Sequence, residues 1–181
     1  MSETAGHMSV LKKAYINKGH ELGLALKKQE DFKMQEVRMN NVIVDSAQFL
    51  FVPQNYQGDV KYRLSIVIPK DHPQLPELKA AFIREAKENF TSARGLTNPL
   101  VDNDAPGASV PYPFYQNSYS LMLNSKFPPS IWDQTGKRIT QPSDLIVTGS
   151  VVNVSFKLKA YSFQDGAKAI SRYLNEVQFV K

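Results

Sequence analysis

Apolar and polar residues alternate along several stretches of this chain, which is the pattern of β-strands with one buried face. The alternation is clearest in residues 60–68, where one face carries Tyr62, Leu64, Ile66 and Ile68 and the other carries Lys61, Arg63, Ser65 and Val67. Residues 146–161 repeat it, with Val152, Val154, Phe156, Leu158 and Ala160 facing inward and Asn153, Ser155, Lys157, Lys159 and Tyr161 facing outward. Residues 37–52 are expected to form two β pieces or one long bent strand, and further strands are predicted in residues 118–125 and 171–180.

One helix interrupts these strands. Apolar residues recur at spacings of three and four from Leu75 to Phe90, which predicts a helix with a single apolar stripe. Pro73 and Pro76 suit its first turn, and the helix is expected to end before Gly95. Many strands with one inserted helix favour a mainly β fold, a small closed antiparallel β-barrel with a capping helix, over alternating parallel βαβ units.

Composition and charge narrow the function classes. The 181 residues carry a net charge of +5, which is compatible with nucleic acid or an anionic membrane as a partner. The absence of cysteine excludes a disulfide scaffold, a thiolate nucleophile and a cysteine-based zinc site. No apolar run approaches the roughly 20 residues of a membrane helix and no signal peptide is apparent, so no membrane partner is expected.

The first 36 residues differ from the rest of the chain. Residues 1–8 are interpreted as a tag remnant, because Gly6-His7-Met8 looks like a cloning scar. Residues 9–36 are rich in lysine and poor in large apolar residues, which predicts a flexible arm or a short helix around residues 21–28. This leader is either a solvated segment without a specific role or a basic arm that contacts phosphates. Residues 37–181 are expected to form the folded domain.

Four segments, in order along the chain, resemble the tailed-phage single-stranded DNA-binding proteins. They are residues 58–71 (GDVKYRLSIVIPKD), residues 98–104 (NPLVDND, similar to a "PL-x-D-x-D" loop), residues 149–161 (GSVVNVSFKLKAY) and residues 174–180 (LNEVQFV, similar to an "LN-x-VQ" ending). The resemblance implies an OB-fold and sequence-independent binding of single strands in phage DNA replication or recombination. It also implies work in the cytoplasm of the infected host, alongside phage replication proteins, and it leaves a homodimer open.

The chain departs from these relatives in two ways. Its leader before Val37 is longer, and it stops at Lys181 where relatives often carry an acidic tail that recruits partners. We therefore expect either that a tail was trimmed or that partner recruitment works differently.

Binding an unpaired strand without reading its sequence needs cations for the phosphates and flat rings for the bases. The candidates for phosphate contact are Lys61, Arg63, Lys157 and Lys159. The candidates for stacking are Tyr112, Phe114, Tyr115 and Tyr161. The alternatives are that the lysines serve solubility and that the loop aromatics plug the mouth of the barrel, while Trp132 is expected in the core or at a barrel end.

No catalytic residue, metal site or cofactor is predicted. Phosphate-binding glycine loops are absent, and His7, His20 and His72 are scattered without metal-ligand spacing. Asp102 and Asp104 are the one carboxylate pair that could hold a divalent cation for a nuclease, although the same residues are typical of a turn. The alternatives to a binding protein are a metal-dependent nuclease and a protein–protein adaptor of a replisome or virion, and an annealing mediator would use the same barrel.

Overall fold

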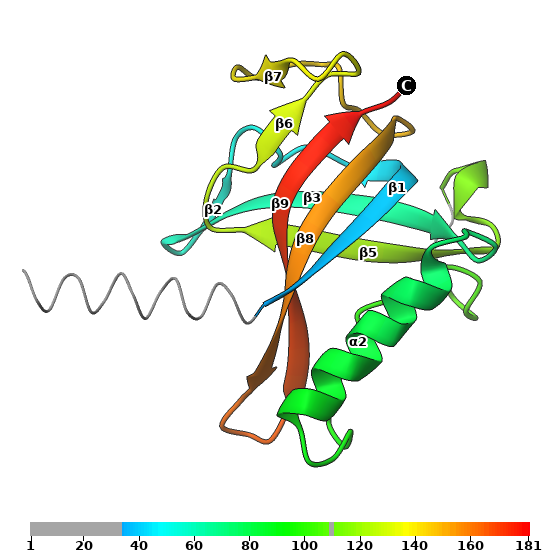
Figure 1. Cartoon of the computed structure of the whole chain (residues 1–181), viewed down its shortest axis with the longest axis vertical. Coiled ribbons are helices and arrows are strands. Elements are labelled where there is room, and N and C mark those ends of the chain that lie inside the picture. The colour runs from blue at the N-terminus through cyan, green and yellow to red at the C-terminus, as the bar shows by residue number, and fades with distance from the viewer. Residues whose placement is uncertain (1–33, 109–110) are drawn as a thin grey trace, which may run out of the picture. The chain divides into compact units, whose positions relative to one another are not determined.

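The computed structural model describes residues 34–108 and 111–181, and strands dominate this part of the chain (Figure 1). The elements are β1 (Gln35–Ser46), β2 (Gln54–Tyr56), β3 (Asp59–Pro69), helix α2 (Leu75–Asn89), β4 (Val101–Asp102), the 3-10 turn η1 (Pro113–Tyr115), β5 (Ser118–Ser125), β6 (Ser130–Trp132), β7 (Arg138–Ile139), β8 (Val151–Ser162) and β9 (Lys168–Phe179). The predicted mainly β fold with one inserted helix is confirmed.

Five strands pair in a closed ring. β1 pairs with β3, β3 with β5, β5 with β9, β9 with β8, and β8 again with β1. All of these pairings are antiparallel except β5 with β9, where the recorded pair is Asn124 with Tyr173. Counting the five strands along the chain, the ring order is 1-2-3-5-4, which is the order of an OB-fold. In Figure 1, β9, β8 and β1 run side by side across the near face, and β3 and β5 cross behind them.

The compact unit spans Gln35–Lys181, and β1 begins two residues before the predicted domain start at Val37. The predictions for the leader up to residue 33 lie outside the described residues. No helix in the described part of the chain has both the length and the apolar character needed to cross a membrane.

Side chains that alternate inward fill the ring. Leu64, Ile66, Phe156 and Leu158 have no exposed surface, as their alternation with polar neighbours predicts. Val67 is fully buried as well, although it belongs to the opposite face of β3. The 3-10 turn η1, which is distant in sequence, contacts β3, and its Tyr115 bonds to the same Asp45 as Ser65, two residues before Val67. The outward face of β3 is therefore exposed near its beginning and covered near its end.

Helix α2 carries the predicted apolar stripe and closes one side of the ring. Leu75, Leu78 and Phe82 are buried, and Phe90 packs against the core just after the helix ends. The helix contacts β8, β1 and β9. It therefore fixes the β8–β9 hairpin from the side (Figure 1).

A buried glutamate joins this helix to β8. Glu85 is only 7% exposed, and its Oε1 accepts a hydrogen bond of 2.9 Å from the backbone N–H of Ala160. In the described register, pairing of β8 with β1 ends at Leu158, opposite Gln35, so Ala160 lies beyond that strand. Burial raises the pKa of the Glu85 carboxyl above its ordinary value of 4.5, against the opposing effect of the Ala160 hydrogen bond.

Replacing Glu85 with alanine should lower the free energy of unfolding by roughly 1–3 kcal/mol, because it removes the acceptor for the Ala160 N–H. Glu85→Gln keeps a carbonyl oxygen and should lose less. The native state holds the Glu85 proton to a higher pH than the unfolded chain does. The wild type should therefore lose stability relative to Glu85→Gln as pH rises above about 4.5. Thermal unfolding of the wild type, Glu85→Ala and Glu85→Gln at several pH values measures both the loss of stability and its pH dependence. Equal unfolding temperatures for the three proteins at every pH would contradict both predictions.

Candidate nucleic-acid interface

Two of the predicted cations lie in one continuous row on the outside of the ring. Lys157 of β8 pairs with Tyr173 of β9, Tyr173 pairs with Asn124 of β5, and Asn124 pairs with Arg63 of β3. All four point outward, because their sequence neighbours Phe156, Leu174, Leu123 and Leu64 are buried. At about 4.8 Å per strand spacing, Lys157 and Arg63 are roughly 14 Å apart along the surface. We call the outward side of β3, β5, β9 and β8 the outer face.

The β8–β9 hairpin adds rings to these cations. The hydroxyls of Tyr161 and Tyr173 share a hydrogen bond, and Tyr161 is 37% exposed. Lys159 lies on β8 two residues before Tyr161, and its Nζ is 5.8 Å from the centre of the Tyr161 ring. Burial, with the Tyr161 hydrogen bond as a second cause, raises the pKa of Tyr173 to about 12, so this phenol stays neutral at neutral pH. The hairpin thus presents aromatic rings beside two ammonium groups.

Lys61 is placed differently from the other predicted cations. It is paired with β2, and its ammonium forms an ion pair with Asp59. The pKa of the Asp59 carboxyl is lowered, first by the hydrogen bond from Lys61 and also by the charges of Lys61, Lys126 and Arg63. Part of the Lys61 charge is therefore already neutralised. Lys126, which the sequence analysis did not single out, adds an exposed cation near Arg63.

The three loop aromatics form a stack at another part of the outer face. The ring centres are 5.2 Å apart for Tyr112 and Phe114, and 5.1 Å apart for Phe114 and Tyr115. Tyr115 is the buried end, 8% exposed, and its hydroxyl donates to Asp45, which also accepts a hydrogen bond of 2.8 Å from Ser65. Burial raises the pKa of Tyr115, with Asp45 as a further cause. Tyr115 therefore anchors the stack, and Tyr112, 46% exposed, carries its accessible ring.

The carboxylate pair is occupied by a lysine. The Nζ of Lys70 lies 2.7 Å from Asp102 Oδ1 and 2.7 Å from Asp104 Oδ2. These hydrogen bonds lower the pKa of both carboxyls and raise that of Lys70. Asp104 also accepts a 3.0 Å hydrogen bond from the backbone N–H of Asn117, just before β5. Between residues 34 and 181, gaps excluded, no group of three His, Asp or Glu side chains is placed to hold a metal ion.

Sequence reasoning missed three contributors. Asn124 and Tyr173 lie on the outer face, and Trp132, which was expected in the core or at a barrel end, is half-buried and lines a groove there. The signal for each was available, because Leu123, Leu174 and Ile131 are apolar and buried, which turns their neighbours outward.

Comparison with known proteins addresses the family and the fold. Residues 33–181 match the family described as "Enterobacter phage Enc34, ssDNA-binding protein". The structure of the single-stranded DNA-binding protein from bacteriophage Enc34 in complex with ssDNA aligns with a TM-score of 0.67 and 15% identity, over 80% of this chain and 85% of that one. The gp2.5 single-stranded DNA-binding protein encoded by bacteriophage T7 aligns with a TM-score of 0.58 and 14% identity, over 81% and 86%. No curated protein sequence matches this chain.

At these identities the structural likenesses establish a shared fold, and the family follows from the sequence match. That match covers most of the chain and includes all four segments on which the resemblance rested. The chain belongs to the family of the single-stranded DNA-binding protein of Enterobacter phage Enc34.

Proposed function

We propose that this protein binds single-stranded DNA on its outer face, largely independently of sequence, in phage DNA replication and recombination. The row that joins Lys157, Tyr173, Asn124 and Arg63 across four strands carries the proposal. It combines cations that follow phosphates with a ring on which any base can stack. In this ring order β3 and β5 are the second and third strands, the face with which OB-folds bind oligonucleotides.

The stack that ends in Tyr112 extends the same surface. Ser65 lies two residues beyond Arg63 on the outward side of β3, and its hydroxyl donates to the Asp45 that anchors Tyr115. A DNA strand that lies along β3 and passes Arg63 therefore reaches the aromatic stack of Tyr112, Phe114 and Tyr115 near the end of β3. The DNA path we propose begins at Tyr112, passes Arg63 and ends on the β8–β9 hairpin at Tyr161.

The protein acts in this proposal by binding and not by catalysis. The observation that supports this is the Lys70 ammonium between Asp102 and Asp104, in the position that a catalytic cation would need. These residues instead fix the loop between α2 and β5. No cofactor is required, and the setting is the host cytoplasm, where unpaired strands arise during phage replication. Replication proteins and a second copy of the chain are the further partners we propose.

Fluorescence anisotropy of a labelled oligo-dT across a salt series tests the function. Four outer-face cations, Arg63, Lys126, Lys157 and Lys159, should give a slope of roughly −3 in log K against log salt, at about 0.7 per phosphate. Absence of binding at low salt would contradict the proposal and favour the protein–protein adaptor. Shortening of the oligonucleotide on addition of Mg²⁺ or Mn²⁺ would favour the nuclease.

A further inference from the structure

A groove of about 290 Å³ lies on the part of the outer face that β8 and β9 form. Trp132 forms one wall and Arg38 of β1 the other, while Ser155, Glu176 and Gln178 form the floor. Trp132 pairs with Gln178, and both point outward because Ile131 and Val177 are buried. The volume is at the lower end of the ~300–1,000 Å³ of small-ligand sites, which suits one flat heterocycle.

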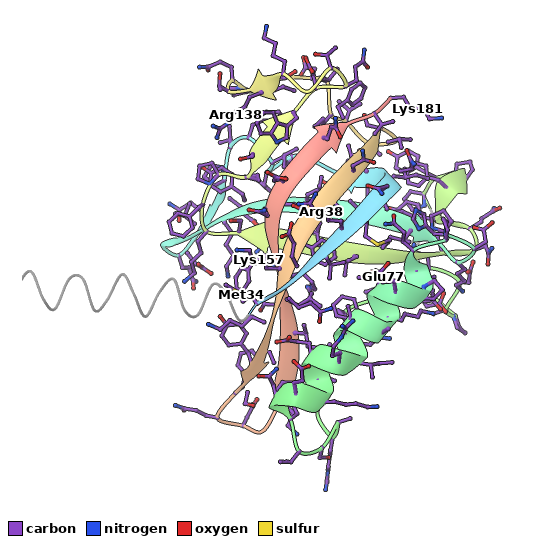
Figure 2. All side chains as sticks on the ribbon, in the orientation of Figure 1. Met34, Arg38, Glu77, Arg138, Lys157 and Lys181 are labelled. Atoms are coloured by element: carbon purple, nitrogen blue, oxygen red, sulfur yellow. The ribbon has the colours of Figure 1, made fainter. Side chains whose placement is uncertain are left out.

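The groove adjoins the proposed DNA path at Tyr173, on the side of that residue away from Tyr161. The pair of Ser155 with Glu176 follows the row of Lys157 and Tyr173 along the β8–β9 hairpin. Arg38 is paired with Ser155 on the other side of β8. Figure 2 shows Arg38 and Lys157 over the same near face of the molecule. A nucleotide that leaves Tyr173 along β9 therefore meets the groove next.

The tryptophan wall is held by a turn. Asp133 follows Trp132, and its Oδ1 accepts hydrogen bonds from the backbone N–H of Thr135 at 2.8 Å and of Lys137 at 2.9 Å. These bonds close the β6–β7 hairpin, in which Trp132 pairs with Arg138. The indole is thus presented on a short braced hairpin, which lowers the entropy cost of stacking a base against it.

The groove holds one carboxylate without a protein partner. Glu176 is half-buried, and within the described ranges its carboxylate makes no hydrogen bond or ion pair. Arg38, the cation in the lining, is bonded to Glu36 at 3.1 Å instead. Gln178 Oε1 accepts from Asn153 at 3.1 Å, which leaves the Gln178 NH₂ group to donate. The lining therefore offers a flat ring, a carboxylate acceptor, and amide and guanidinium donors.

We propose that this groove is a nucleobase subsite that prefers guanine, an inference that rests on the proposed DNA-binding function. The Glu176 carboxylate repels phosphate and needs N–H donors. Guanine is the DNA base with two adjacent donors, N1–H and N2–H₂, on its Watson–Crick edge, and a carboxylate can accept from both. Its O6 acceptor would then face the donors Gln178 or Arg38, while the ring stacks on Trp132. Thymine presents two carbonyls to the same carboxylate and is disfavoured.

Competition between labelled oligo-dT and the same oligonucleotide with one central dG tests the inference. The dG oligonucleotide should bind roughly five-fold more tightly or better, the lower end of what a bidentate base contact gives. One dA or dC in that place should give less, and inosine, which lacks the N2 amine, should lose part of the gain. Oligo-dT binding itself reports on the proposed function, so its presence with no dG preference overturns this inference alone.

Two charge-matched variants complete the test. Glu176→Gln should abolish the dG preference and bind oligo-dT somewhat more tightly, because an anion beside the DNA is removed. Glu88→Gln removes the same charge from the exposed side of α2 and should keep the preference. A dG preference that survives in Glu176→Gln, or that disappears equally in Glu88→Gln, would overturn the assignment of the groove.

Discussion

Replacing Tyr161 and Tyr173 together with alanine should weaken oligo-dT binding by about 30-fold or more, with the salt dependence unchanged. Each base stacked on an aromatic ring contributes roughly 1–3 kcal/mol, and the lower bound for two rings gives this factor. Neither neutral phenol contacts a phosphate as a cation does, so the number of ions released on binding stays the same. Anisotropy titrations of wild type and variant at several salt concentrations measure both quantities.

The matched control is Tyr161→Phe with Tyr173→Phe. It keeps both rings and removes only the hydroxyl pair that joins them, so affinity should stay near the wild-type value. Thermal unfolding of all three proteins checks that the hairpin is intact, because Tyr173 is half-buried. A loss as large in the phenylalanine variant as in the alanine variant would assign the effect to the hydroxyls and exclude stacking.

The direction in which strand residues point was predictable, because it depends on a local period of two. Arg63 and Lys157 face outward because their neighbours Leu64, Phe156 and Leu158 are buried. The alternation of apolar and polar residues in the sequence predicts this orientation. Asp59 and Lys61 are two residues apart on one strand, so their ion pair could also have been foreseen. Local spacing therefore accounts for most of the fold class and for the orientation of the candidate cations.

Which strands become neighbours was beyond the sequence. Asn124 and Tyr173 are 49 positions apart and meet through the parallel contact that closes the ring. Without that contact, Arg63 and Lys157 have no defined relation, because register between distant strands is set by the whole core. The burial of Tyr115 has the same origin, since η1 contacts β3 and β5 from a loop that is distant from β3 in sequence. Long-range packing thus decided which aromatics stayed accessible.

The ion pairs of Lys70 with Asp102 and Asp104 were also beyond prediction from the sequence. Asp102 and Asp104 form an i, i+2 pair that is typical of a turn and that could also hold a cation. In the structure the Lys70 ammonium contacts both carboxylates, and Lys70 comes from the end of a different segment. A single sequence does not reveal that the ammonium lies between the two carboxylates, because the contact spans the whole of α2.

Replacing Arg63 and Lys157 with alanine should weaken oligo-dT binding about 25-fold at 0.1 M salt and flatten the salt slope by roughly 1.4. Each lost phosphate contact removes about 0.7 from the slope, so two contacts remove a factor of about 25 between 1 M and 0.1 M salt. The two residues come from β3 and β8, on opposite ends of the row through Asn124 and Tyr173. Their combined effect therefore reports whether one strand of DNA spans the whole row.

Arg84→Ala with Lys87→Ala is the charge-matched control, because both residues lie on the exposed side of α2. It lowers the net charge of the protein by the same amount and should change affinity and slope much less. On a short oligo-dT that can cover only one end of the row, the single variants Arg63→Ala and Lys157→Ala should have unequal effects. On a longer oligo-dT both single variants should lose affinity, and their losses in binding free energy should add. Equal losses in the outer-face variant and in the α2 variant would mean that net charge alone governs binding, and the continuous row would then have no special role.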